Sequence, residues 1–177
     1  MYLWTATGSP QTNDFERGIT MKKIGAITVG QSPRVDLIPE IQPILGDSVE
    51  IIQAGALDGL SKGEIAKFVP RPGENVLVSR LTDGTSATFG ESYILPRLQL
   101  CIDDLEQQGV SLILLLCTGE FPAEFHSNVP LIFPDHILKG LIPAISVKNL
   151  SVIIPTKAQE EQMPGKWKDC CDSLHVT

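Results

Sequence analysis

The sequence is poor in cysteine, in aromatic residues and in basic charge. Its 177 residues include only 4 cysteines and 6% aromatic residues, and 14 Lys and Arg stand against 21 Asp and Glu, for a formal net charge of -7. The cysteines form no CxxC pair and have no histidine at metal-ligand spacing, so the sequence supports neither a zinc site nor a disulfide framework. The acidic balance, without any Lys- or Arg-rich run, disfavours nucleic acid as a partner.

Long apolar runs are also lacking. No apolar segment approaches the roughly 20 residues that a membrane-spanning helix needs, and residues 1–20 have neither the basic nor the apolar region of a secretion signal. We therefore expect a cytoplasmic protein without a membrane partner. Gly8, Pro10 and Gly18 interrupt every pattern in residues 1–20. This segment is predicted to be a disordered extension that precedes a functional start at Met21.

Apolar runs and helical patterns alternate along the rest of the chain. The runs that predict strands are 24–29, 49–54, 112–116, 131–133 and 150–154, and helical spacing marks 91–108 and the segment after Pro134. This alternation predicts a three-layer αβα fold with a mainly parallel sheet. Asp83-Gly84 lies between the strand-like runs 76–81 and 85–89, which predicts a β-hairpin insert.

The run 112–116 ends in Cys117-Thr118-Gly119. Ligands of parallel α/β sheets bind beyond the carboxyl ends of the strands, so Cys117 is a candidate reactive thiol. The alternative is that Cys117 is a small core hydrophobe, which is a common role for a lone cysteine. Cys101 falls on the apolar stripe of the helical segment 91–108 and is assigned to the core.

A second candidate loop follows the first strand. Ser32 suits an N-cap and Pro33 the first helical position, and a helix N-terminus beside Arg34 could bind an anion. The alternative is an ordinary capped helix with a solvated arginine. Asp58, after the second strand, could face a ligand or serve only an Asp-Gly turn.

The carboxyl ends of parallel strands lie at one edge of a sheet, so these loops are expected to converge on one cleft. Cys117 and Thr118 are the candidate catalytic residues, and the candidate ligand-binding residues are Ser32, Arg34, Asp58 and Gly119. Neither a metal nor a cofactor is expected. The partner would be a small anionic metabolite, and the formation of a homo-oligomer is left open.

Several motifs together resemble the AroM family: MKKIGAITVGQSPR (21–34), ALDGLS (56–61), RPGE (71–74) and LCTG (116–119). The resemblance covers about residues 21–167. It implies a bacterial cytoplasmic protein of undefined biochemical function. The implied fold is similar to the aspartate/glutamate/hydantoin racemase superfamily, in which two similar α/β halves enclose a cleft and each half supplies one cysteine.

The same resemblance implies the domain organisation. Residues 21–148 would form the first α/β half, and 149–177 the opening of an incomplete second half in a chain truncated at its C-terminus. Cys117-Thr118-Gly119 is similar to the first cysteine loop of the racemases, where the motif is Cys-Asn-Thr. The implied function is the binding of a small carboxylate-type metabolite in a cleft containing Cys117. The alternatives are a cofactor-independent racemase or isomerase that uses Cys117 as acid/base, and an inactive truncated product.

Overall fold

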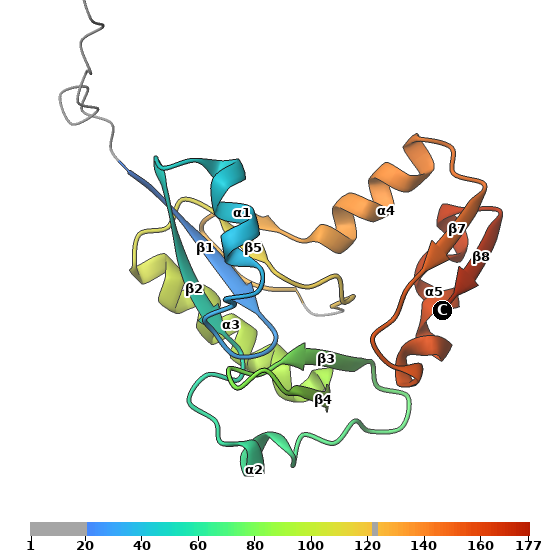
Figure 1. The fold of residues 1–177 in the computed structure, drawn as a ribbon, viewed down its shortest axis with the longest axis horizontal. Helices are drawn as coiled ribbons and strands as arrows, with labels where there is room; N and C mark the ends of the chain where they lie inside the picture. Colours follow the sequence, from blue (N-terminus) through green and yellow to red (C-terminus); the bar gives the residue numbers. More distant parts are fainter. Residues whose placement is uncertain (1–20, 122–123) are drawn as a thin grey trace, which may run out of the picture.

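The computed structural model describes residues 21–121 and 124–177, so the predictions for residues 1–20 lie outside the described residues. The fold is mixed α/β around a four-stranded sheet (Figure 1). Its strands are β1 (Lys22–Thr28), β2 (Val49–Gly55), β5 (Ile113–Leu115) and β6 (Leu131–Ile132), in the order β2-β1-β5-β6. All three neighbouring pairs are parallel, which confirms the predicted mainly parallel sheet.

Helix α3 (Glu91–Gln107) covers one face of this sheet. Its buried residues are Ile94, Leu98, Ile102 and Leu105, and their helical spacing confirms the predicted helix. Gly25 in β1 lets α3 approach closely, because a Cβ atom at this position would lie 2.8 Å from the Leu105 side chain. None of the helices in the described residues is both long enough and apolar enough to cross a membrane.

Helix α1 (Ile38–Leu45) lies on the opposite side of the sheet from α3 (Figure 1) and has no buried residue. The prediction that this helix begins at Ser32 and Pro33 is wrong. The N-cap is Leu37, and a proline, Pro39, occupies the first turn. Ser32 caps no helix because the N–H groups that it would have to accept from have other acceptors: the Arg34 N–H donates to Gln53 Oε1 at 2.7 Å and the Val35 N–H to the Pro33 carbonyl at 3.1 Å. The Ser32 N–H and hydroxyl both donate to Asp58, at 2.7 and 2.5 Å.

Strands β3 (Val76–Arg80) and β4 (Ser86–Gly90) pair antiparallel, outside the four-stranded sheet. The turn between them contains Asp83 and Gly84 and is closed by the Leu81 N–H, which donates to the Thr85 carbonyl at 2.7 Å. Short helix α2 (Lys62–Ile65) precedes the pair. The Ser-x-x-Glu pattern at residues 61–64 predicts a capping box, and the structure confirms it, since Ser61 and Glu64 satisfy each other's backbone N–H groups.

The C-terminal part begins with helix α4 (Pro134–Ala144) and contains a separate two-stranded parallel sheet of β7 (Asn149–Val152) and β8 (Ser173–Val176). Between these strands lie the 3-10 helix η2 (Lys157–Gln162), helix α5 (Met163–Trp167) and the 3-10 helix η3 (Lys168–Cys170). The sequence did not predict β8. This part has its own apolar cluster, centred on Met163, Trp167 and Cys170. The predicted domain division after residue 148 stays a prediction.

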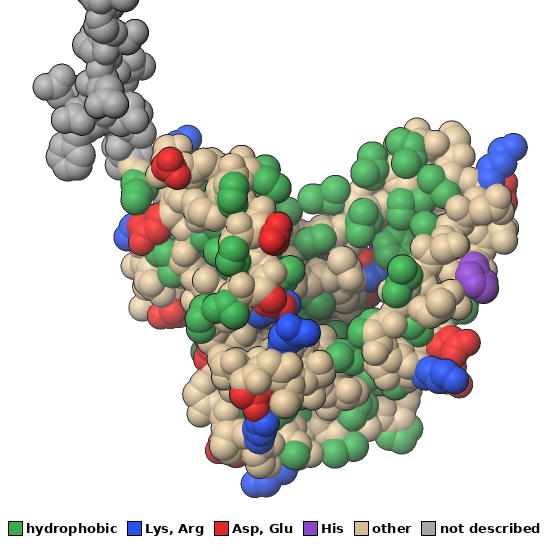
Figure 2. Space-filling model, in the orientation of Figure 1, with side chains coloured by type: hydrophobic (Ala, Val, Ile, Leu, Met, Phe, Trp, Pro, Cys, Tyr) green, Lys and Arg blue, Asp and Glu red, His purple; other side chains and the backbone are tan. Residues whose placement is uncertain are grey.

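Helix α4 is apolar on two sides. Leu138 and Ile142 pack on the C-terminal cluster, whereas Ile137, Leu141 and Ile145 are exposed. Figure 2 shows hydrophobic side chains over α4 and a hollow between this part of the molecule and the part that carries α1.

Candidate functional site

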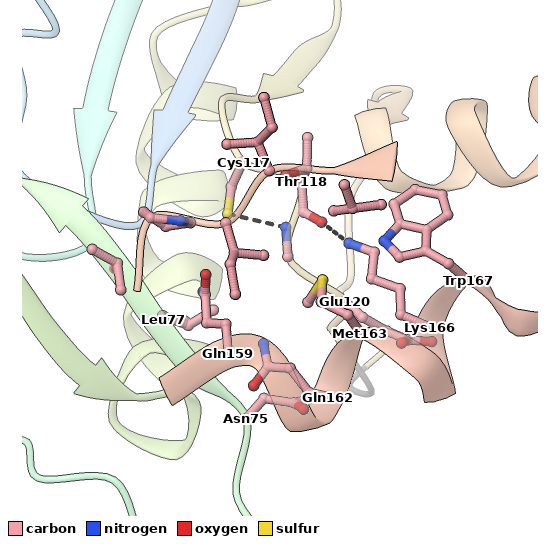
Figure 3. A pocket seen from close by; sticks show the side chains of 16 residues that line it. Asn75, Leu77, Cys117, Thr118, Glu120, Gln159, Gln162, Met163, Lys166 and Trp167 are labelled. Atoms are coloured by element: carbon pink, nitrogen blue, oxygen red, sulfur yellow. Dashed lines mark hydrogen bonds between the residues drawn. The ribbon is translucent and has the colours of Figure 1, made fainter. Parts of the chain in front are cut away.

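The Cys117 loop leaves the central sheet at the carboxyl end of β5. The Leu116 N–H still donates to the Ile27 carbonyl of β1 at 2.7 Å, and the chain then turns away from the sheet. The Gly119 N–H donates to the Cys117 sulfur at 3.2 Å (Figure 3). A Cβ atom at position 119 would lie 3.2 Å from that sulfur and 3.3 Å from Leu77. Glycine therefore keeps the loop folded closely over the thiol.

The surroundings of Cys117 disfavour its thiolate form. Burial raises the pKa of the Cys117 thiol, while the Gly119 N–H and the positive charge of Lys166 oppose this effect only in part. Burial likewise raises the pKa of Cys101 to about 11. Both thiols are therefore protonated at neutral pH, and neither is an activated nucleophile.

A buried ion cluster holds the Cys117 loop from its other side. Asp135 of α4 is 1% exposed. Its carboxylate lies 2.7 Å from the Lys166 ammonium and 3.3 Å from that of Lys139. The Lys166 ammonium also donates to the Thr118 carbonyl, and Lys139 pairs with Glu120 at 2.8 Å. The cluster thus ties the loop to α4 and α5.

The pKa of Lys139 is consistent with its place in this ion cluster. Partial burial alone would lower the Lys139 pKa, but the hydrogen bond to Glu120 and the charge of Asp135 outweigh it and raise the pKa. Sequence reasoning missed Lys166, Lys139 and Asp135. The pattern around Lys166 is weak and broken by Pro164-Gly165, and no spacing rule relates it to a loop 48 residues away.

The larger of two cavities at this edge has a volume of about 550 Å³ and lies between α1, β3 and the Cys117 loop. Arg34, Arg80, Cys117 and Thr118 line it, together with the hydroxyl side chains of Ser79 and Ser86 and apolar residues of α1 and β5. The only charged residues in this lining are the two arginines. The structure therefore brings Arg34, Cys117 and Thr118 to one cavity.

The Arg34 guanidinium already donates hydrogen bonds to two protein side chains. Its Nε and Nη2 donate to the two carboxylate oxygens of Asp36, both at 2.8 Å, and its Nη1 donates to the Thr28 hydroxyl at 3.3 Å. The hydrogen bonds from Arg34 lower the pKa of Asp36 to about 2, and the charge of Arg80 adds to this effect. Asp36 thus neutralises Arg34, whereas Arg80 forms no ion pair with any residue that the structure describes, which leaves an excess of one positive charge.

The smaller cavity has a volume of about 160 Å³ and lies between the Cys117 loop and the C-terminal part (Figure 3). Its lining includes Gly119, Glu120, Gln159, Gln162, Met163, Lys166 and Trp167, and it shares Val78, Cys117, Thr118 and Pro155 with the larger cavity. Two of its amides are engaged. Gln159 Nε2 donates to the Val76 carbonyl at 2.9 Å, and Gln162 Oε1 accepts from the Val76 N–H at 3.1 Å.

Ser32 and Asp58 line neither cavity and are engaged with each other. Asp58 also accepts the Gly55 N–H at 2.8 Å, so one carboxylate joins the ends of β1 and β2. The Arg97 side chain of α3 donates to the carbonyls of Ala56 and Asp58 and thereby joins the turn after β2 to α3. The arrangement gives Asp58 a structural task, while its ligand-binding role and that of Ser32 stay predictions.

The described residues contain no group of three or more His, Cys, Asp or Glu side chains that could hold a metal ion. No curated protein matches this chain. A sequence model described as "AroM protein" matches residues 24–177, which is most of the chain. The matched range includes Arg34, Arg80, the Cys117 loop and Lys166. The match confirms the resemblance that the motifs predicted, whereas truncation stays a prediction. The chain belongs to the AroM family.

Proposed function

We propose that the chain binds a small metabolite through a carboxylate in the larger cavity, with Arg34 and Arg80 on one side of the ligand and Cys117 on the other. The observation that carries this proposal is the charge of the lining: two arginines and no carboxylate. Asp36 neutralises one of the two guanidinium groups, and the excess positive charge attracts an anion. The hydroxyls of Ser86 and Thr118, which also line this cavity, offer further hydrogen bonds.

Binding without catalysis is better supported than cofactor-independent racemisation. Two-base racemisation needs a thiolate that removes a proton and a second thiol on the opposite face of the substrate. Burial raises the pKa of Cys117, which opposes the thiolate. In the part of the chain that the structure describes, Cys117 is the only cysteine that lines either cavity, while Cys170 and Cys171 border a different hollow.

The finer proposal for the fold is that residues 21–148 correspond to one half of a racemase-like, two-half architecture with a hairpin insert. The antiparallel β3–β4 pair supports the hairpin insert, and the separate β7–β8 sheet with its own apolar cluster supports a second unit. Leu138 and Ile142 of α4 pack on that same cluster, which favours a boundary before α4 over one after residue 148. A cytoplasmic location and a homo-oligomer stay predictions.

The test is calorimetric titration of the full chain with hexanoate and with hexanamide, which has nearly the same shape but no charge. Hexanoate should bind and hexanamide should bind at least about tenfold more weakly, because charge-assisted hydrogen bonds supply most of the discrimination. Arg80→Gln should weaken hexanoate binding about tenfold, since it removes the excess positive charge.

Arg71→Gln is the matched control, because Arg71 lies over the Tyr93 ring and lines neither cavity. Equal affinity for the acid and the amide would contradict the proposal. So would an Arg80→Gln variant that binds hexanoate as tightly as Arg71→Gln does.

A further inference from the structure

The two cavities are neighbours around the Cys117 loop. Both are lined by Val78, Cys117, Thr118 and Pro155, so the arginine side and the α5 side adjoin at these residues. A ligand whose carboxylate lies near Arg34 and Arg80 would extend past Cys117 toward the smaller cavity. The chemistry of the smaller cavity then determines what the other end of the ligand can be.

The charged residues that line the smaller cavity already form ion pairs within the protein. Its two charged lining residues are Glu120 and Lys166, and each has its own partner outside the lining. Glu120 pairs with Lys139 at 2.8 Å, and Lys166 pairs with the buried Asp135 at 2.7 Å. A second carboxylate placed here would meet Glu120 and would have to compete with Asp135 for Lys166. Moving a charge from water into such surroundings is unfavourable.

The size and polarity of the smaller cavity suit an uncharged group. Its volume of about 160 Å³ is close to that of an apolar cavity of about 150 Å³ that accepts benzene. Leu77, Met163 and Trp167 supply apolar surface.

We propose that the ligand is a monocarboxylate whose other end is an uncharged group of about six heavy atoms, held in the smaller cavity beside Met163 and Trp167. This inference rests on the proposed function, because it takes the arginine side as the carboxylate site. It assigns the two cavities different tasks: the larger one binds the anionic end, and the smaller one selects against a second charge.

The first test compares hexanoate with adipate, which differs by a second carboxylate at the far end. Titration of the full chain should give hexanoate at least about tenfold higher affinity than adipate. Binding of adipate as tight as that of hexanoate would overturn this inference and leave the proposed carboxylate site standing. Absence of binding by both acids would overturn the inference together with the proposed function.

The second test changes the charge of the smaller cavity. Glu120→Gln releases Lys139 from its exposed partner and gives the cluster one more positive charge, so adipate should gain affinity relative to hexanoate by about tenfold. Glu160→Gln is the matched control, because it makes the same change at an exposed position of η2 outside both cavities. An equal effect of Glu120→Gln on both acids would overturn the inference.

Discussion

Replacement of Lys166 by Met should destabilise the fold more than its position near the C-terminus suggests. The Lys166 side chain is 8% exposed and its partner Asp135 is 2% exposed, so the variant leaves a buried carboxylate without its nearest cation. Removing one member of a buried ion pair costs about 3–5 kcal/mol. Lys139 remains 3.3 Å from Asp135, which places the expected loss of unfolding free energy at the lower end, about 3 kcal/mol.

The assay is urea unfolding followed by circular dichroism, with Lys139→Met as the matched control. Lys139 is 26% exposed and lies farther from Asp135, so its removal should cost only about 1 kcal/mol. In a thermal scan, about 3 kcal/mol corresponds to a decrease in Tm of about 6–12 °C for a chain of this size. If Lys166→Met costs no more than Lys139→Met, the buried pair does not stabilise the fold and the reasoning is refuted.

Three further outcomes are expected. Asp58→Ala should lower the unfolding free energy by about 2–3 kcal/mol in the same assay, because it leaves the N–H groups of Ser32 and Gly55 and the Ser32 hydroxyl without their acceptor. Ser32→Ala should cost about 1 kcal/mol, and equal losses would contradict this. Phe89→Ala should cost about 3–5 kcal/mol, since Phe89 is fully buried, and a loss below about 1 kcal/mol would show that its site collapses readily. Iodoacetamide at pH 7, read by peptide mass spectrometry, should label Cys117 and Cys101 more slowly than in the urea-unfolded chain. Labelling of Cys117 should accelerate only above the usual thiol pKa of about 8.5, because its raised pKa keeps the neutral form to higher pH; fast labelling at pH 7 would contradict the structure.

Elements whose determinants are local could be predicted from the sequence. Ser61 and Glu64 are three residues apart and satisfy each other's backbone, so their capping box follows from the sequence and is present. The helix α3 was predicted for the same reason, because its buried face repeats at helical spacing. The unbroken apolar run 112–116 predicts a strand of a parallel sheet, and β5 pairs parallel with β1 and β6.

The failures involve contacts between distant residues. Serine is a common N-cap, but the Arg34 N–H that Ser32 would have to accept from donates to Gln53, 19 residues later, and the helix begins at Ile38. Strand β8 is only four residues long and half-exposed, and a short strand of mixed polarity becomes recognisable only through its pairing with β7. The position of Lys166 against the Cys117 loop depends on the whole C-terminal part and has no local signal.

The side-chain amides of Gln159 and Gln162 oppose association of the protein through the edge of β3. Strand β3 has β4 on one side only, so the backbone groups of its other edge have no strand partner, and such an edge can pair with a strand from another molecule. At Val76 both the N–H and the carbonyl are already bound by these two side chains. The helical turn of η2 therefore acts as a side-chain substitute for a neighbouring strand, and it blocks edge-to-edge association at the start of β3 without adding a strand to the sheet.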